Sequence, residues 1–112
     1  MEIQKVIEDK TLTIKLIGRL DAITSLELDK DLKVSAEGMD TLIFDLLNLD
    51  YIASAGLRIL LKYQKQMDKI GGQMKIKNVK PEVREVLDMT GFSDFLHIDD
   101  GDSGKKKLLI EF

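Results

Sequence analysis

Residues 41–60 read Thr-Leu-Ile-Phe-Asp-Leu-Leu-Asn-Leu-Asp-Tyr-Ile-Ala-Ser-Ala-Gly-Leu-Arg-Ile-Leu, and this stretch decides the fold class. Residues 41–49 are nearly continuous in apolar character, which is typical of a strand covered on both faces in a parallel sheet. Over residues 55–70 the apolar side chains recur at helical spacing, and Gly71-Gly72 supplies a stop signal. A buried central strand that runs into a long helix indicates an α/β domain.

The segment before this stretch carries a strand pattern and a helix pattern. Apolar and polar residues alternate over residues 11–16, which predicts a half-buried strand that ends at Gly18 and pairs with residues 2–7. Residues 24–27, Thr-Ser-Leu-Glu, fit a capping box, in which the first and last side chains satisfy opposite backbone donors. We therefore expect a helix over residues 24–36. Its inward face would carry three apolar residues spaced by four: Leu28, Leu32 and Ala36.

The segment after this stretch repeats the strand and helix patterns. Met74 and Ile76 alternate with lysines and predict a further strand. Pro81 suits the first position of a helix that Gly91 would end, and Ile98 is expected in an edge strand. Alternating strands and helices imply a parallel or mixed sheet.

These patterns predict one domain over residues 1–112. We expect a mixed central sheet of four to five strands, with helices packed mainly on one face. Residues 99–107 are polar and glycine-rich and indicate a loop, and the apolar residues 108–112 indicate a possible extra strand.

Composition excludes several classes of protein. The 112 residues are 44% hydrophobic and 33% charged, which indicates a single ordered globular domain. A formal net charge of −3 gives no general attraction for nucleic acid. The sequence has no cysteine and no apolar run long enough to span a bilayer. We therefore expect a cytoplasmic protein that does not insert directly into a membrane.

The sequence also lacks the residues of an enzyme or metal site. Ser54 has His97 as its only possible histidine base, and Ile52 stands where a nucleophile elbow has glycine. The acidic segment from Asp99 departs from a calcium loop, because Lys105 occupies the position that requires glycine. We expect no catalytic residue, no metal and no cofactor.

A basic stripe runs along the predicted long helix. Its members follow one another at spacings of four, three and four: Arg58, Lys62, Lys65 and Lys69. The pattern fits a solvated helix face and, as an alternative, a surface that docks an acidic partner.

Residues 49–60 resemble the signature of anti-sigma-factor antagonists, which are STAS domains. Further blocks match the same family in the same order along nearly the whole chain: Gly18-Arg19-Leu20-Asp21, Asp45, Gly71-Gly72 and residues 81–92. The tail beyond about residue 100 falls outside the family pattern.

The resemblance implies that Ser54 is phosphorylated by a partner serine kinase that doubles as an anti-sigma factor. Ser54 is also expected at the N-cap of the long helix, where its hydroxyl would stabilise the helix by ~1 kcal/mol. The two roles are compatible, because a phosphate would meet free backbone N–H groups and the positive end of the helix dipole. Ala53 and Ala55 replace the acidic and hydroxyl residues that flank this serine in the family.

The resemblance also implies a partner-binding surface around this serine: Asp21, Ala53, Ser54, Ala55, Gly56 and Arg58. Asp21 matches a family acid near the switch serine, and a turn residue ahead of a helix is its alternative interpretation. Gly56 would let a partner backbone approach the first helical turn, although glycine in a helix costs ~1 kcal/mol relative to alanine.

The implied function is that of an anti-sigma factor antagonist. Unphosphorylated chain would bind the anti-sigma factor and release the sigma factor, phosphorylation would abolish binding, and a phosphoserine phosphatase would restore it. The first alternative is a STAS regulatory subunit of a membrane transport ATPase, in which Ser54 is only a cap. The second is an enzyme or phosphocarrier, which the lone His97 and the absence of cysteine disfavour. The sequence does not indicate an oligomeric state.

Overall fold

The computed structural model describes residues 1–99. Its elements follow in the order β1 (Glu2–Glu8), β2 (Thr11–Leu20), α1 (Ala22–Ser35), β3 (Thr41–Asp45), β4 (Leu49–Ile52), α2 (Ser54–Lys69), β5 (Gln73–Lys77), α3 (Pro81–Met89), the short 3-10 helix η1 (Phe92–Asp94) and β6 (Ile98–Asp99). The expected loop at 99–107, beyond its first residue, and the expected extra strand at 108–112 lie outside the described residues.

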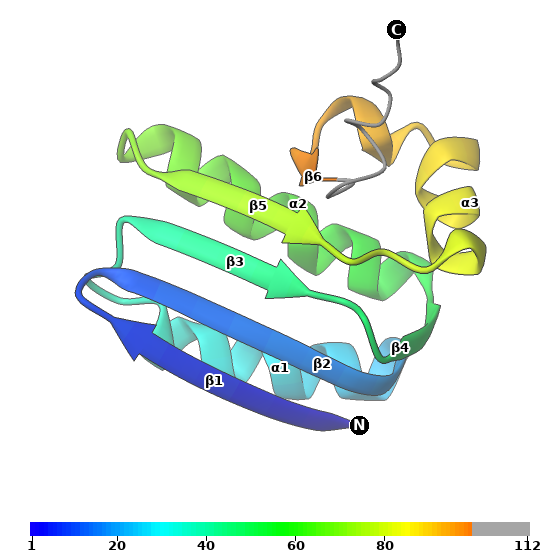
Figure 1. Cartoon of the computed structure of the whole chain (residues 1–112), viewed down its shortest axis with the longest axis horizontal. Coiled ribbons are helices and arrows are strands. Elements are labelled where there is room, and N and C mark those ends of the chain that lie inside the picture. Colours follow the sequence, from blue (N-terminus) through cyan, green and yellow to red (C-terminus); the bar gives the residue numbers. More distant parts are fainter. Residues whose placement is uncertain (100–112) are drawn as a thin grey trace, which may run out of the picture.

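The strands form one mixed sheet (Figure 1). Five of them lie in the order β1-β2-β3-β5-β6, and β4 pairs with the far end of β2. β1 and β2 are antiparallel, whereas the other described pairs are parallel. The α/β class and the mixed sheet are therefore confirmed, with six strands among residues 1–99 where four to five were expected.

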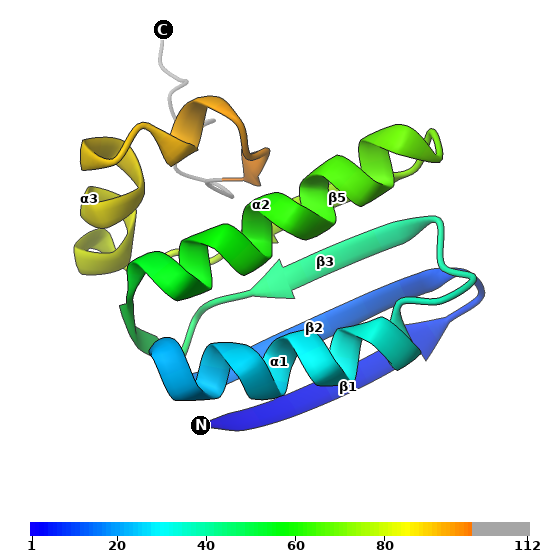
Figure 2. The same ribbon diagram turned by 180° about the vertical axis from the view of Figure 1, so that it is seen from behind.

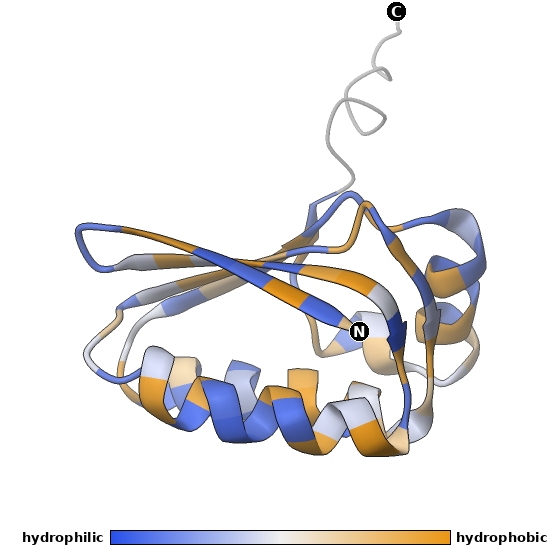
Figure 3. Cartoon of the chain, turned by 90° about the horizontal axis from the view of Figure 1, so that it is seen from below, coloured by the Kyte–Doolittle hydropathy of each residue, from blue (hydrophilic) through white to orange (hydrophobic). Residues whose placement is uncertain are grey.

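Helices α1 and α2 cover one face of the sheet, and α3 lies at its end beside β4 (Figures 2 and 3). The strand side chains that face α1 and α2 are wholly buried, as Leu12, Ile14 and Leu16 of β2 illustrate. Each such side chain contributes ~1.5–3 kcal/mol through burial of apolar surface. Lys15 and Lys75 alternate with buried residues on their strands and are exposed on the opposite face. This alternation fixes which face of the sheet carries the core.

The prediction of one central strand over residues 41–49, covered on both faces, was wrong in two respects. β3 ends at Asp45, because the carboxylate of Asp45 accepts hydrogen bonds from the Leu47 N–H at 3.1 Å and the Asn78 side-chain amide at 3.0 Å. The chain then turns and starts β4. In addition, Thr41 and Ile43 are only half-buried, so only one face of β3 is fully covered.

The prediction that Gly18 ends its strand was also wrong. β2 continues to Leu20, and Gly18 lies within it at a φ of +110°, a conformation that favours glycine. Here β2 exchanges its partner: residues 11–15 pair with β3 and residues 18–20 pair with β4, with a register shift after Gly18. This irregularity brings the ends of β2 and β4 together, and both lead directly into helices.

The predictions for the second half are confirmed. α2 ends at Lys69, just before Gly71-Gly72, and Met74 and Ile76 are buried in β5. Pro81 is the first residue of α3. Gly91 follows that helix at a φ of +80°, and Ile98 lies in the edge strand β6.

Candidate functional site

Two helices begin side by side at one end of the sheet. Leu20 and Ile52, the last residues of β2 and β4, are register partners in the parallel pair. The Ala53 N–H donates a hydrogen bond of 2.9 Å to the Leu20 carbonyl, so the next residues, Asp21 and Ala53, leave the sheet together. These two are the N-caps of α1 and α2. The positive ends of two helix dipoles therefore lie at the same edge.

Asp21 caps α1, which begins at Ala22 and not at the expected position near Thr24. The Asp21 carboxylate accepts the N–H groups of Ile23 at 3.1 Å and Thr24 at 2.9 Å. The Asp21 N–H donates in return to the Thr24 hydroxyl at 2.8 Å, which completes a capping box. Thr24 thus belongs to a capping box, but as the third residue of α1 and not as its N-cap. Glu27 has no part in this capping box.

The same contacts set the charge of Asp21. The hydrogen bonds that Thr24 donates from its backbone and its hydroxyl, followed by that of Ile23, hold the pKa of the Asp21 carboxyl below its ordinary value. Asp21 therefore presents a fixed negative charge beside the start of α2.

The start of α2 has no side-chain cap. Its N-cap is Ala53, and Ser54 is the first helical residue, so the expectation that Ser54 is the N-cap was wrong. The Ser54 side chain is exposed, and its hydroxyl forms no hydrogen bond with any residue in the described part of the chain. The first backbone bond of the helix runs from the Leu57 N–H to the Ala53 carbonyl at 3.1 Å. The preceding N–H groups of the first turn lack intrahelical acceptors, and no acidic residue lies among them.

Gly56 is the third residue of α2 and is buried on the side of this first turn that faces the strands. A Cβ atom at Gly56 would lie 2.7 Å from both Cγ and Cδ2 of Leu20 and 3.0 Å from Cγ1 of Ile52. The structure therefore explains the glycine by close packing of α2 on the strand ends, whereas the sequence-based interpretation placed a partner backbone there.

The basic stripe on α2 is divided by an ion pair. Arg58, Lys65 and Lys69 are exposed, but the Lys62 ammonium lies 2.8 Å from the Asp29 carboxylate of α1. The hydrogen bond from Lys62 is the main cause that lowers the pKa of the Asp29 carboxyl. The hydrogen bond from the Tyr63 hydroxyl, at 2.8 Å, lowers it further. Burial and the contact with Asp29 raise the pKa of Tyr63. Lys62 therefore joins α2 to α1, and Arg58 is the stripe residue that lies nearest to Ser54 along the helix.

Exposed apolar residues lie near the starts of α1 and α2, and sequence reasoning missed them. Ile23 and Leu26, in the first two turns of α1, are 71% and 70% exposed, and Tyr51 of β4 is 40% exposed. Figure 3 shows hydrophobic positions on the outer side of α1 near its first residues. The Arg19 guanidinium lies 4.1 Å from the centroid of the Tyr51 ring. The signal was available, because Ile23 and Leu26 are three residues apart and do not share the helix face of Leu28 and Leu32.

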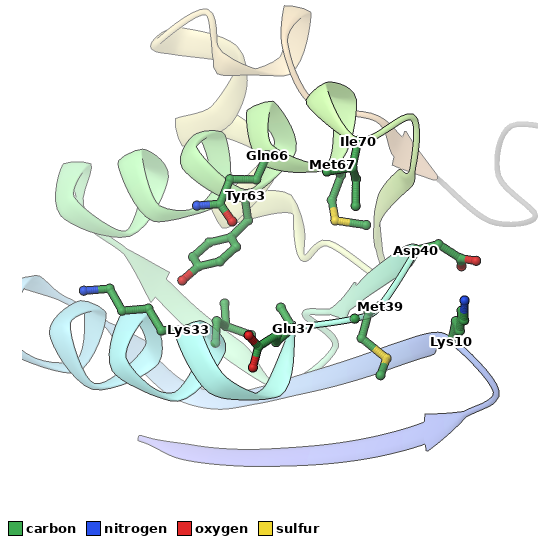
Figure 4. A pocket seen from close by; sticks show the side chains of 12 residues that line it. Lys10, Lys33, Glu37, Met39, Asp40, Tyr63, Gln66, Met67 and Ile70 are labelled. Atoms are coloured by element: carbon green, nitrogen blue, oxygen red, sulfur yellow. The ribbon is translucent and has the colours of Figure 1, made fainter.

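A pocket of about 490 Å³ opens at the other end of the two helices (Figure 4). Its walls include Leu32, Tyr63, Met67 and Ile70, and none of the site residues predicted from the sequence lines it. Ser54, at the opposite end of α2, does not line this pocket. Ser54 and Arg58 instead lie exposed on the surface of the domain.

Within residues 1–99, no group of three or more histidine or carboxylate side chains is arranged to hold a metal ion. Over the same range, none of the helices combines the length and the apolar character that crossing a bilayer requires.

Comparison with known proteins gives consistent results. The model of the STAS domain family matches residues 2–101. The putative anti-sigma factor antagonist BtrV of Bordetella bronchiseptica is 35% identical over 85 residues, which cover 75% of this chain and 73% of that protein. The anti-sigma F factor antagonist of Paenibacillus polymyxa is 30% identical and covers 81% of this chain and 80% of its own.

Solved structures share the fold. The anti-sigma factor antagonist SpoIIAA in its unphosphorylated form superposes with a TM-score of 0.76 at 18% identity, over 99% of this chain and 100% of that one. A sulfate transporter family protein from Wolinella succinogenes superposes with a TM-score of 0.70 at 22% identity, over 96% and 93% of the two chains. At these identities the superpositions establish the fold alone.

Proposed function

The chain belongs to the STAS domain family, and we propose that it acts as an anti-sigma factor antagonist that phosphorylation of Ser54 switches off. The observation that carries the proposal is the exposed, unbonded hydroxyl of Ser54 at the uncapped start of α2. Sequence relatives named as antagonists support this role over that of a transporter subunit, whereas the fold alone is common to both classes.

The docking surface in this proposal comprises residues at the beginnings of α1 and α2 and at the end of β4. We call it the switch surface, and its members are Asp21, Ile23, Leu26, Tyr51, Ala53, Ser54, Ala55 and Arg58. It combines exposed apolar side chains with a few charges, which is the composition of a protein interface with a polar rim. Gly56 supports it from beneath by allowing α2 to pack closely on Leu20.

The partner in this proposal is an anti-sigma factor that is also a serine kinase. The Ser54 oxygen attacks the γ-phosphorus of ATP held by the partner, a new O–P bond forms, and ADP leaves. The hydroxyl proton passes to a base on the kinase, because no histidine or free carboxylate is bonded to Ser54 in the described residues. The chain itself contributes only the acceptor and needs neither a cofactor nor a metal ion. A phosphoserine phosphatase would reverse the modification by hydrolysis.

Phosphorylation would act on docking and leave the fold intact. The first-turn N–H groups of α2 and the helix dipole stabilise an anion, and Ser54 is exposed, so no packed side chain has to move. In the complex, however, the phosphate would be removed from water against a partner surface that offers it no cation. This would cost several kcal/mol, and 1.4 kcal/mol is already about tenfold in affinity. We place this exchange in the cytoplasm, where a sigma factor and its inhibitor act on transcription.

The test is affinity capture from the native cell with two matched baits, Ser54→Ala and Ser54→Asp. We expect the alanine bait to retain a soluble serine kinase that also binds a sigma factor, and the aspartate bait to lose it. Capture of transporter subunits by both baits equally would contradict the proposal and support the alternative function.

A further inference from the structure

Ser54 and Arg58 lie one helical turn apart on the exposed side of α2. Ser54 is the first residue of the helix and Arg58 is four positions later, and both side chains are exposed. Residues four apart are neighbours on a helix surface. Because helical side chains lean toward the N-terminus, the Arg58 side chain is within reach of the turn that contains Ser54.

The other basic side chains of this region are already engaged. Arg19 stacks on the Tyr51 ring, Lys80 lies 2.5 Å from the Asp50 carboxylate, and Lys62 is paired with Asp29. Arg58 has no ion pair with any described residue. The nearest carboxylate at the start of α1, that of Asp21, is bound to N–H groups of its own helix. Arg58 is thus the cation on α2 that is available to a new anion at Ser54.

We infer that Arg58 is the intramolecular partner of the phosphate on Ser54. The inference rests on the proposed function for the presence of that phosphate. A guanidinium presents paired N–H donors that match two phosphate oxygens, and the four-residue spacing requires no change in the helix backbone. The phosphate is then held between the N–H groups of the first turn and the Arg58 guanidinium.

This pairing gives Arg58 two states. In unphosphorylated chain its guanidinium projects from the switch surface and can meet an acidic group of the partner. In phosphorylated chain the same guanidinium is bound to the phosphate. Phosphorylation therefore changes the switch surface twice, by adding a dianion and by withdrawing a cation from the partner.

The test measures the second pKa of the phosphate by ³¹P NMR in chain that carries phosphoserine introduced directly at position 54. A nearby guanidinium favours the dianion, so we expect this pKa to be lower in wild type than in Arg58→Ala by about half a unit. Arg58→Lys should restore part of the shift, because lysine keeps the charge but loses the paired geometry. The matched control is Lys65→Ala, which removes an exposed cation that lies about three helical turns from Ser54. This change should leave the pKa of the phosphate unchanged.

Equal pKa values in wild type and Arg58→Ala would overturn the inference. So would an equal change in Lys65→Ala, because the effect would then be one of overall charge. Neither result depends on a kinase, since the phosphoserine is introduced directly. Failure of the proposed function would show separately, as partner capture that phosphoserine at position 54 does not alter.

Discussion

Replacing Gly56 by alanine tests the packing that supports the switch surface. The added Cβ would meet Leu20 at 2.7 Å, about 1 Å inside a normal carbon contact. Leu20 is 0% exposed, so its side chain cannot move aside into solvent. Overpacking of this kind costs ~1–3 kcal/mol, whereas alanine gains ~1 kcal/mol over glycine as a helix former. We expect a net loss of about 1 kcal/mol, or a melting temperature lower by roughly 4–8 °C for a domain of this size.

Urea unfolding of Gly56→Ala, with and without Leu20→Ala, provides the measurement and its control. Leu20→Ala alone should be destabilising because it opens a cavity, but it also makes room for the new Cβ. The alanine at position 56 should therefore cost less, or become favourable, in the double variant. A Gly56→Ala chain that is more stable than wild type, or additive losses in the double variant, would refute the packing explanation.

Three further outcomes follow from the site. Asp29→Ala should lower stability by ~1.5–3 kcal/mol at neutral pH, because it removes a charged acceptor for Lys62 and Tyr63. Because the pKa of Asp29 is lower in the folded chain than in the unfolded chain, this stabilisation is complete above the unfolded pKa and is lost as pH falls through the folded pKa. The difference in stability between variant and wild type should therefore shrink as the pH is lowered. Ala53→Asp should stabilise the chain by ~1 kcal/mol in thermal unfolding, because it supplies the missing side-chain cap of α2; an unchanged melting temperature would argue against an open helix end. Ile23→Glu should leave the melting temperature nearly unchanged but abolish partner capture, and undiminished capture would remove Ile23 from the switch surface.

Much of the fold could be predicted from periodicity, because that signal reflects which face of an element is buried. The alternation at 11–16 and the helical spacing after Ala55 both correspond to buried side chains in the structure. The errors arose where hydrogen bonds decide where a strand ends and which strand it pairs with. The apolar run at 41–49 does not reveal that the Asp45 carboxylate turns the chain after β3, nor that β2 continues past Gly18 by changing its partner.

The candidate site was inferred from family resemblance and not from periodicity, and its role stays a prediction. Family resemblance located Ser54, and the structure brings Asp21, Ala53 and Ser54 to one edge through the bond between Ala53 and Leu20. The cap of α1 was misplaced, because both Asp21 and Thr24 are good capping residues and only the backbone geometry chooses between them. The exposed Ile23 was missed because the sequence analysis asked only which apolar residues of this helix face inward, and Ile23 does not share the face of Leu28 and Leu32.

The central claim is that Ser54 controls docking and not folding, and paired measurements on three chains test it most directly. They are the dissociation constant for the captured kinase and the melting temperature of wild type, Ser54→Ala and Ser54→Asp. Because the Ser54 hydroxyl forms no cap, we expect the free energy of unfolding of both variants to lie within about 0.5 kcal/mol of the wild-type value. Ser54→Ala should bind as wild type does, and Ser54→Asp should bind weaker by orders of magnitude. Wild-type affinity in Ser54→Asp, or a loss of affinity that accompanies unfolding, would contradict the claim.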